Sequence, residues 1–275
     1  MAGKLLLVGT PIGNLSDLSP RALEALKSAQ LILCEDTRHT RKLLTHFGID
    51  RPTQSFHEHN EQEKASAMIE RIEGGAIVAL VSDAGVPIVS DPGFRLVRLA
   101  RERKVPIEPI PGPFAGILAL VASGIAPLPF TFFGFTPHRH GERLEFYRRI
   151  AAGGTTAIVY ESPERLVESL HDAAEVLGNV EVTVAREMTK VHEEFVSGTI
   201  AEVLAEFRAR PGVRGEVTIV FGAAAARSER VDATAIAAEF ERLRAAGMRR
   251  NDAIKLVAEK FGLARNDVYR LLLDV

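Results

Sequence analysis

The chain has 275 residues, 46% of them hydrophobic, and a formal net charge of −2 at pH 7. This length is enough for two compact cores and a small appendage, which argues against a single small binding module. One cysteine, Cys34, excludes a disulfide framework and a cysteine-based metal site, and it favours a reducing compartment. The near-zero net charge gives no global argument for nucleic-acid binding, which must therefore depend on local clusters.

The first apolar run of the sequence is short. Five apolar or small residues, Leu5 to Gly9, precede Thr10 and Pro11. A signal-peptide core or a membrane span needs a longer apolar run. We therefore expect a soluble, cytoplasmic protein.

Residues 1–115 alternate short apolar runs with amphipathic segments, which predicts an α/β domain with a largely parallel sheet. Strands are expected at residues 5–8, 31–34 and 77–81. Ser19 and Pro20 are expected to be the N-cap and the first residue of the first helix. Further helices are expected to start at Thr37, Asn60 and Asp91 and after Pro113.

Residues 116–224 predict a second α/β domain of a different kind. Its strands are expected at residues 131–134, 156–160, 180–185, 194–197 and 216–221. Because the later strands follow one another closely, this sheet is expected to be partly antiparallel. Residues 225–275, the tail, show helical spacing without a strand pattern. They predict a small helical domain that ends in a helix-turn-helix-like pair, with Asn251 and Asn266 as N-caps.

Two loops follow predicted strands, at the position where an α/β sheet binds ligands. Residues 9–14 match neither a dinucleotide-binding nor a phosphate-binding glycine pattern, so a structural turn explains them equally well. Residues 82–93 place two aspartates, two prolines and two glycines in twelve positions. Asp91 suits an N-cap, whereas Asp83 is expected to point from the strand end into the crevice.

Several segments in register resemble the tetrapyrrole methylase family, and within it the branch that methylates small-subunit ribosomal RNA. They are residues 9–15, 35–40, 57–61, 82–93, 111–115, 160–162, 185–190 and 215–217. The resemblance implies a homodimer with a two-domain class III methyltransferase fold and a small C-terminal helical domain. It also implies S-adenosylmethionine as methyl donor, no metal, and 2'-O-methylation of a decoding-centre cytidine in 16S ribosomal RNA within the small ribosomal subunit.

The resemblance also implies where the donor binds. In the first domain the matching positions are Pro11, Ser82, Asp83, Ala84, Pro87, Phe114 and Ala115. In the second domain they are Tyr160, Glu161, Met188 and Thr218, which are expected to enclose the adenosine. A sulfonium methyl group is already activated, so the protein mainly has to hold an attacking oxygen in line with it.

A ribose hydroxyl is a weak nucleophile at neutral pH, so a base within reach would assist it. Asp36, Glu187 and Lys190 are the candidates. Asp36 also suits a helix cap or a pair with Arg38. Glu187 also suits an ion pair with Arg186, and Lys190 suits a phosphate as well as a proton.

His57 and His59 flank Glu58 at alternate positions of a segment expected to be extended. Two histidines without a third ligand make a poor metal site, and methyl transfer needs no metal. The preferred interpretation is that they line the active site or contact RNA.

Two basic stretches are candidates for contacts with RNA phosphates, residues 138–149 and residues 242–255. An ordinary solvated helix face is the usual meaning of such stretches. Acidic residues nearly cancel the charge of the tail, so its role in gripping the ribosomal subunit is a hypothesis.

Three other functions stay open on the residues alone. A methylase of a tetrapyrrole or another small molecule fits the same fold but leaves the helical tail unexplained. A non-enzymatic ribosome-binding factor fits the tail and the basic stretches. A nicotinamide enzyme lacks its required glycine spacing.

Overall fold

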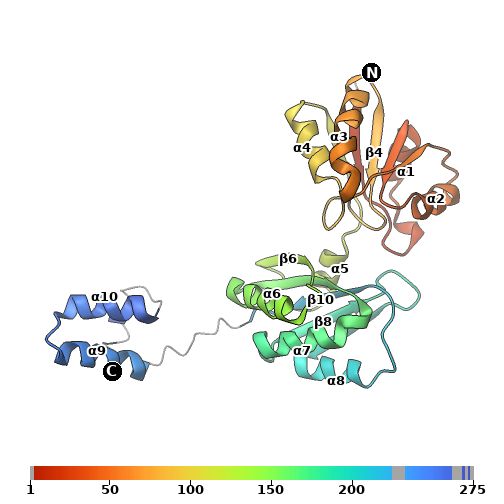
Figure 1. The fold of residues 1–275 in the computed structure, drawn as a ribbon. Coiled ribbons are helices and arrows are strands. Elements are labelled where there is room, and N and C mark those ends of the chain that lie inside the picture. The colour runs from red at the N-terminus through yellow and green to blue at the C-terminus, as the bar shows by residue number, and fades with distance from the viewer. Residues whose placement is uncertain (1–2, 225–232, 262–267, 270–271, 273–275) are drawn as a thin grey trace. The chain divides into compact units, whose positions relative to one another are not determined.

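The computed structural model describes residues 3–224, 233–261, 268, 269 and 272. The chain divides into two compact units, residues 1–224 and residues 225–275, and each is described by itself. The first unit holds two five-stranded sheets (Figure 1). In the described part of the chain, no helix has the length and apolar character needed to cross a membrane.

All strands of the first sheet run parallel, in the order β3-β2-β4-β1-β5. They are β1 Lys4–Val8, β2 Leu31–Cys34, β3 Thr53–Ser55, β4 Ile77–Val81 and β5 Ile107–Ile110. The three central strands are apolar runs, as expected of strands covered on both faces, and their prediction is confirmed. The edge strands β3 and β5 escaped prediction because β3 is polar and β5 contains Pro109, which an edge tolerates.

Helices cover both faces of this sheet. The helices α1 Pro20–Ser28 and α2 Thr37–His46 pack on one face, and α3 Glu58–Glu73 and α4 Phe94–Glu102 pack on the other (Figure 1). Leu26 and Leu44 are fully buried in the core of the first face, as Ile69 and Leu96 are in that of the second. A 3-10 helix, η1 Leu15–Asp17, precedes α1.

The starts of α1 and α2 are confirmed, although the capping residue of α2 differs, and the start of α3 is shifted. Ser19 caps α1, and Pro20 is its first residue. Asp36 rather than Thr37 caps α2, because its carboxylate accepts the Arg38 N–H at 2.7 Å. The helix α3 begins at Glu58, where the Asn60 side chain accepts the His57 N–H at 3.0 Å. His57 is extended, but residues 58 and 59 are helical, so the expectation of an extended segment over residues 57–59 is wrong.

The predicted cap of α4 is also wrong. Its N-cap is Gly93 rather than Asp91, and a glycine offers no side-chain acceptor. A carboxylate from the neighbouring helix α3 caps α4 instead. Glu61 Oε1 accepts the N–H groups of Arg95 at 2.7 Å and Leu96 at 3.1 Å. This leaves the Asp91 side chain available for another role.

The second sheet is mixed, in the order β6-β7-β10-β8-β9, with only β6 and β7 parallel. Its strands are β6 Phe130–Phe135, β7 Thr156–Glu161, β8 Glu181–Arg186, β9 Glu194–Thr199 and β10 Val217–Phe221. All five were predicted, as was the antiparallel part. One face is covered by α6 His140–Gly153, α7 Leu166–Leu177 and α8 Ile200–Arg208, with η2 Pro163–Arg165 before α7. The other face is covered by α5 Ala115–Ala122.

The second unit contains α9 Ala233–Ala245 and α10 Arg250–Phe261, packed through Ile236, Phe240, Ile254 and Val257. Asn251 lies inside α10, so it is not the N-cap that was expected. Asn266 lies outside the described residues. The domain boundaries at residues 115 and 224 stay predictions.

Candidate active site

The two glycine-containing loops meet at the carboxyl ends of β1 and β4. Thr10 and Gly85 exchange backbone hydrogen bonds of 2.9 and 3.0 Å, which join the loop after β1 to the loop after β4. These strands are neighbours, and the helices that follow them, α1 and α4, cover opposite faces of the sheet. This arrangement opens a crevice at the strand ends, where doubly wound sheets bind ligands.

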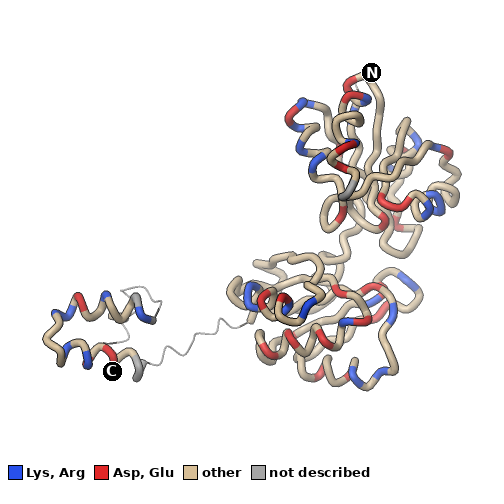
Figure 2. Tube along the Cα trace, viewed as in Figure 1, with Lys and Arg blue, Asp and Glu red and all other residues tan. Residues whose placement is uncertain are grey.

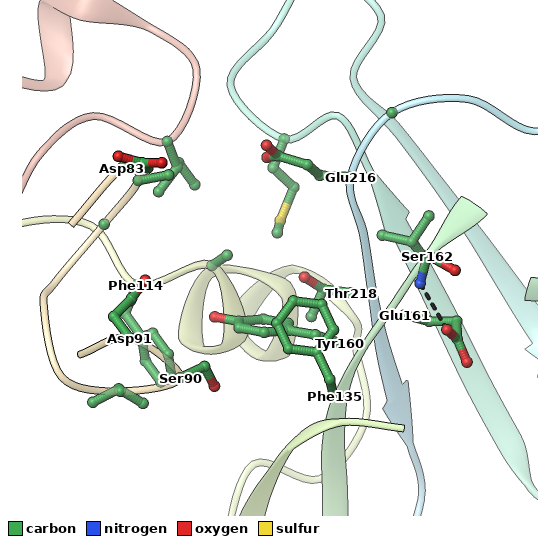
Figure 3. A pocket seen from close by; sticks show the side chains of 18 of the residues that line it. Asp83, Ser90, Asp91, Phe114, Phe135, Tyr160, Glu161, Ser162, Glu216 and Thr218 are labelled. Carbon is green, nitrogen blue, oxygen red and sulfur yellow. Dashed lines mark hydrogen bonds between the residues drawn. The ribbon is translucent and has the colours of Figure 1, made fainter. Parts of the chain in front are cut away.

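A cavity of about 370 Å³ lies at these loops and continues to the ends of β7 and β10. We call it the aromatic cavity. It is lined by eight of the residues predicted to bind the donor: Asp83, Ala84, Phe114, Ala115, Tyr160, Glu161, Met188 and Thr218. Figure 3 shows the labelled side chains around it. The volume is in the range of sites that hold a small molecule.

Aromatic rings form one wall of this cavity. Tyr160 lies edge-on to Phe132, Phe135 and Phe114, with ring centroids 5.0, 5.3 and 6.5 Å away. Phe135 is 60% exposed, an unusual state for a large apolar side chain. Such rings stack on a planar base and attract cations through their faces.

The charged side chains that line the cavity are acidic. Asp83, Asp91 and Glu216 line it, and Figure 3 shows Asp83 and Glu216 on opposite sides. No lysine or arginine is among the described residues that line this cavity. A ligand that carries positive charge and an aromatic base is therefore favoured over an anion.

Asp91, Phe135 and Glu216 line the cavity but were not among the predicted site residues. Burial, together with the negative charges of Glu35 and Asp83, raises the pKa of Asp91 to about 7. A carboxyl group with this pKa changes its charge near neutral pH, which is typical of functional sites. A signal for Asp91 was present in the sequence: Gly93, two residues later, can be the N-cap of α4, the position that had been assigned to Asp91.

Glu161 lines the cavity but is occupied by structural partners. Its side chain is fully buried, accepts the hydroxyl of Thr136 and the N–H of Ser162, and pairs with Arg165 at 2.7 Å. Figure 3 shows the bond to Ser162. Its carboxylate thus holds the end of β7 in place.

Backbone strain gathers in two loops at the site. Outside glycine, positive φ angles occur at Ile88 and Ser90 in the loop after β4, with values of 82° and 71°. They also occur at Glu187 and Thr189, with values of 51° and 66°, in the loop after β8. Such conformations cost about 1–3 kcal/mol each and are common at binding sites.

Three predicted donor residues lie outside the aromatic cavity. Pro11 and Ser82 line a second cavity of about 330 Å³, which we call the basic cavity. The Ser82 hydroxyl is buried and donates to the Gly85 carbonyl at 2.9 Å, a structural bond. Pro87 is buried and lines neither cavity.

Two of the three candidate bases, Glu187 and Lys190, form an ion pair of 2.8 Å. The hydrogen bond from Lys190 and that from the Glu216 N–H hold the pKa of Glu187 below its usual value. Partial burial disfavours the charge of Lys190, yet the bond to Glu187 and the charge of Glu216 raise its pKa. At neutral pH the lysine is therefore protonated, and it lines the basic cavity.

Asp36 serves the backbone. The hydrogen bond from the Arg38 N–H holds the pKa of Asp36 below its usual value. A carboxylate with a lowered pKa is a weak base. The structure thus places Asp36 as the cap of α2, outside both cavities.

Three arginines of the basic stretch at residues 138–149 form ion pairs within the protein. Arg143 is 3% exposed and pairs with Asp172 at 2.7 Å. Arg139 pairs with Glu142 and Arg148 with Glu145, at 3.3 and 3.0 Å. In the tail, the described Arg242 and Lys260 both pair with Glu239.

No group of three or more His, Cys, Asp or Glu side chains that could hold a metal occurs among the described residues. His57 lies at the start of α3, with a ring nitrogen 2.9 Å from Asn60 Nδ2. It lines neither cavity. The side chain of His59 is outside the described residues.

Comparison with known proteins decides the family. A sequence model of the Tetrapyrrole (Corrin/Porphyrin) Methylases matches residues 4–204. The chain belongs to the tetrapyrrole methylase family. The resemblance seen in the sequence, and the two-domain fold with C-terminal helices that it implied, are thereby confirmed.

Relatives of this tetrapyrrole methylase include proteins described as ribosomal RNA small subunit methyltransferase I. The protein from Mesorhizobium japonicum is 41% identical, over 98% of this chain and 92% of the relative. That from Synechocystis sp. is 40% identical, over 99% of this chain and 98% of the relative.

Solved structures with the tetrapyrrole methylase fold are more distant in sequence. A diphthine synthase aligns with a TM-score of 0.60 and 15% identity, over 79% of this chain and 89% of that one. A uroporphyrin-III-C-methyltransferase from Thermus thermophilus aligns with a TM-score of 0.54 and 19% identity, over 81% and 95%. They show the shared fold alone.

Proposed function

We propose that the chain transfers the methyl group of S-adenosylmethionine to the 2'-hydroxyl of a decoding-centre cytidine in 16S ribosomal RNA. The observation that carries this proposal is the similarity, at about 40% identity over nearly the whole chain, to proteins named for methylation of small-subunit ribosomal RNA. Such an enzyme acts in the cytoplasm, where ribosomes are assembled, and we propose that it acts as a homodimer.

The aromatic cavity suits this donor. S-adenosylmethionine carries an adenine ring, an ammonium group and a sulfonium, which supplies an activated methyl group. The rings of Phe114, Phe135 and Tyr160 suit the adenine and the sulfonium charge. The carboxylates of Asp83, Asp91 and Glu216 suit the positive charges.

In the proposed reaction a ribose oxygen forms a bond to the methyl carbon, the carbon–sulfur bond breaks, and the hydroxyl proton leaves. The residues of this chain contribute mainly by positioning, since in-line alignment alone removes much of the barrier. The charged Lys190 beside Glu187 attracts a hydroxyl oxygen as it loses its proton. Glu187, with its lowered pKa and its pair with Lys190, is a weak base, so the proton passes to solvent.

The test uses methyl-labelled S-adenosylmethionine and small ribosomal subunits that lack the modification, followed by alkaline hydrolysis of the RNA. Alkaline cleavage needs a free 2'-hydroxyl, so ribose methylation leaves a labelled, alkali-resistant dinucleotide. We expect that dinucleotide. Label in mononucleotides would mean base methylation and would contradict the proposed atom.

The same assay separates the other functions. Absence of labelled RNA, with donor binding intact by calorimetry, would favour a methylase of a small molecule such as a tetrapyrrole. Absence of donor binding, with the subunit still bound, would favour a non-enzymatic ribosome-binding factor.

A further inference from the structure

The helix α2 is a basic element at the edge of the site. Its ten residues include Arg38, His39, Arg41 and Lys42 and no acidic residue. Figure 2 shows the Lys and Arg gathered along it. His39 and Lys42 line the basic cavity. Sequence patterns alone did not single out this helix, because its charges acquire a role only through their position beside the cavity.

The basic cavity adjoins the aromatic cavity. Both are lined by Ile12, Asp83, Ala84 and Glu216. Asp83 Oδ1 accepts the N–H of Asp36, the N-cap of α2, at 3.3 Å. The carboxylate between the two cavities thus also holds the start of the basic helix.

The cations of α2 are exposed, whereas Arg139, Arg143 and Arg148 of residues 138–149 each pair with a carboxylate within 3.3 Å. The Arg38 side chain is 92% exposed, and its one acidic neighbour, Asp36, is 3.8 Å away and already accepts a backbone N–H. Lys42 is exposed, and Arg41 donates to the neutral hydroxyl of Thr53. The charges on α2 are therefore available to an anion from outside.

An RNA substrate has to approach from this side. The attacking hydroxyl must lie next to the donor methyl group, so the nucleotide must enter a space that adjoins the aromatic cavity. Among its described lining residues that cavity has carboxylates and no lysine or arginine, so it repels phosphate. Lys190 already pairs with Glu187 and Glu216, at 2.8 and 3.3 Å. Cations for the phosphates must come from elsewhere.

We propose that the basic cavity receives the ribose of the target nucleotide and that Arg38 and Lys42 on α2 bind the flanking RNA phosphates. This inference rests on the proposed function, since it takes RNA as the acceptor. It assigns the main RNA contact of the first unit to α2 rather than to residues 138–149.

The test compares two double variants of the full chain, Arg38→Gln with Lys42→Gln and, as a matched control, Arg98→Gln with Arg101→Gln. The control removes the same charge from α4, which packs on the opposite face of the sheet and lines neither cavity. The probe is a labelled single-stranded RNA fragment of the decoding region, titrated at several salt concentrations. Donor affinity by calorimetry shows that each variant is folded.

We expect the α2 variant to bind the RNA more weakly, with the slope of log affinity against log salt reduced by about 1.4, or about 0.7 per lost phosphate contact. The α4 control should keep the wild-type slope. Donor affinity should stay within about twofold in both variants.

Equal losses in both variants would overturn the inference, because they would reflect net charge alone. Unchanged RNA binding by the α2 variant, with methyl transfer by the wild-type chain intact, would overturn the inference and leave the proposed function standing. A wild-type chain that neither binds nor methylates RNA would overturn both.

Discussion

Two adjoining cavities of similar size differ in their charged side chains. The aromatic cavity, of about 370 Å³, is lined by aromatic rings and carboxylates, whereas the basic cavity, of about 330 Å³, shares Asp83 and Glu216 with it and adds His39, Lys42 and Lys190. The first suits a cationic donor and the second an anionic acceptor. A chain with almost no net charge can thus hold two oppositely charged substrates through the local placement of its charged side chains.

The largest expected effect concerns the basic cavity alone. Lys190→Ala, or Glu187→Gln, breaks the ion pair that fixes the loop after β8, and a misplaced reactant lowers the rate by up to about a hundredfold. Donor affinity should change by less than about threefold. Steady-state kinetics with calorimetry measures both. A double variant with full activity would place catalysis elsewhere.

Replacing Asp83, which lines both cavities, should affect both of them. Asp83→Ala removes a charge beside the donor and the acceptor of the Asp36 N–H. Bonds to charged groups are worth enough to weaken donor binding by about tenfold to a hundredfold, measured by calorimetry. Asp50→Asn, at an exposed position, is the control. Unchanged donor affinity in Asp83→Ala would contradict the placement of the donor.

Donor binding in the aromatic cavity should depend on pH. Asp91, with a pKa of about 7, loses its proton between pH 6 and pH 8, and the new negative charge attracts a cationic donor. Donor affinity should rise about fivefold over this interval, and Asp91→Asn should abolish the part of that rise due to this group. A profile unchanged by the substitution would exclude Asp91.

The free energy of unfolding should change with pH in the opposite direction to donor affinity. Because the folded chain holds this proton more tightly than an unfolded one, Asp91 lowers the free energy of unfolding as pH rises from about 4 to about 7. Thermal melts of the donor-free chain should show that the Asp91→Asn variant loses less stability over this interval than the wild-type chain does.

The smallest effect is expected at the rim. Phe135→Ala removes one exposed ring beside Tyr160 and should weaken donor binding by about threefold, without altering the salt dependence of RNA binding. Leu128→Ala, at another exposed apolar position, is a matched control. A Phe135 variant with wild-type donor affinity would remove this ring from the donor site.

The sequence predicted the buried strands well because β1, β2 and β4 are apolar runs. It missed β3 and β5, which are strands only through pairing at the sheet edges. It misplaced the start of α4 because the capping carboxylate, Glu61, comes from another helix. Such partners are set by tertiary structure, which local patterns do not contain.

The site was predicted in the same uneven way. The resemblance brought together eight residues that line the aromatic cavity, whereas residue type alone suggested Asp91 as a cap and residues 138–149 as a basic surface. Burial raises the pKa of Asp91, and pairing with Asp172 buries Arg143. Both effects depend on neighbours that are distant in the sequence.

A crystal structure of the full chain with S-adenosylhomocysteine, the demethylated donor, tests the central claim most directly. The account predicts the adenine against the rings of Phe114 and Tyr160, and the sulfur directed toward the wall shared with the basic cavity. Ligand density outside the aromatic cavity, or a sulfur directed away from the basic cavity, would contradict it.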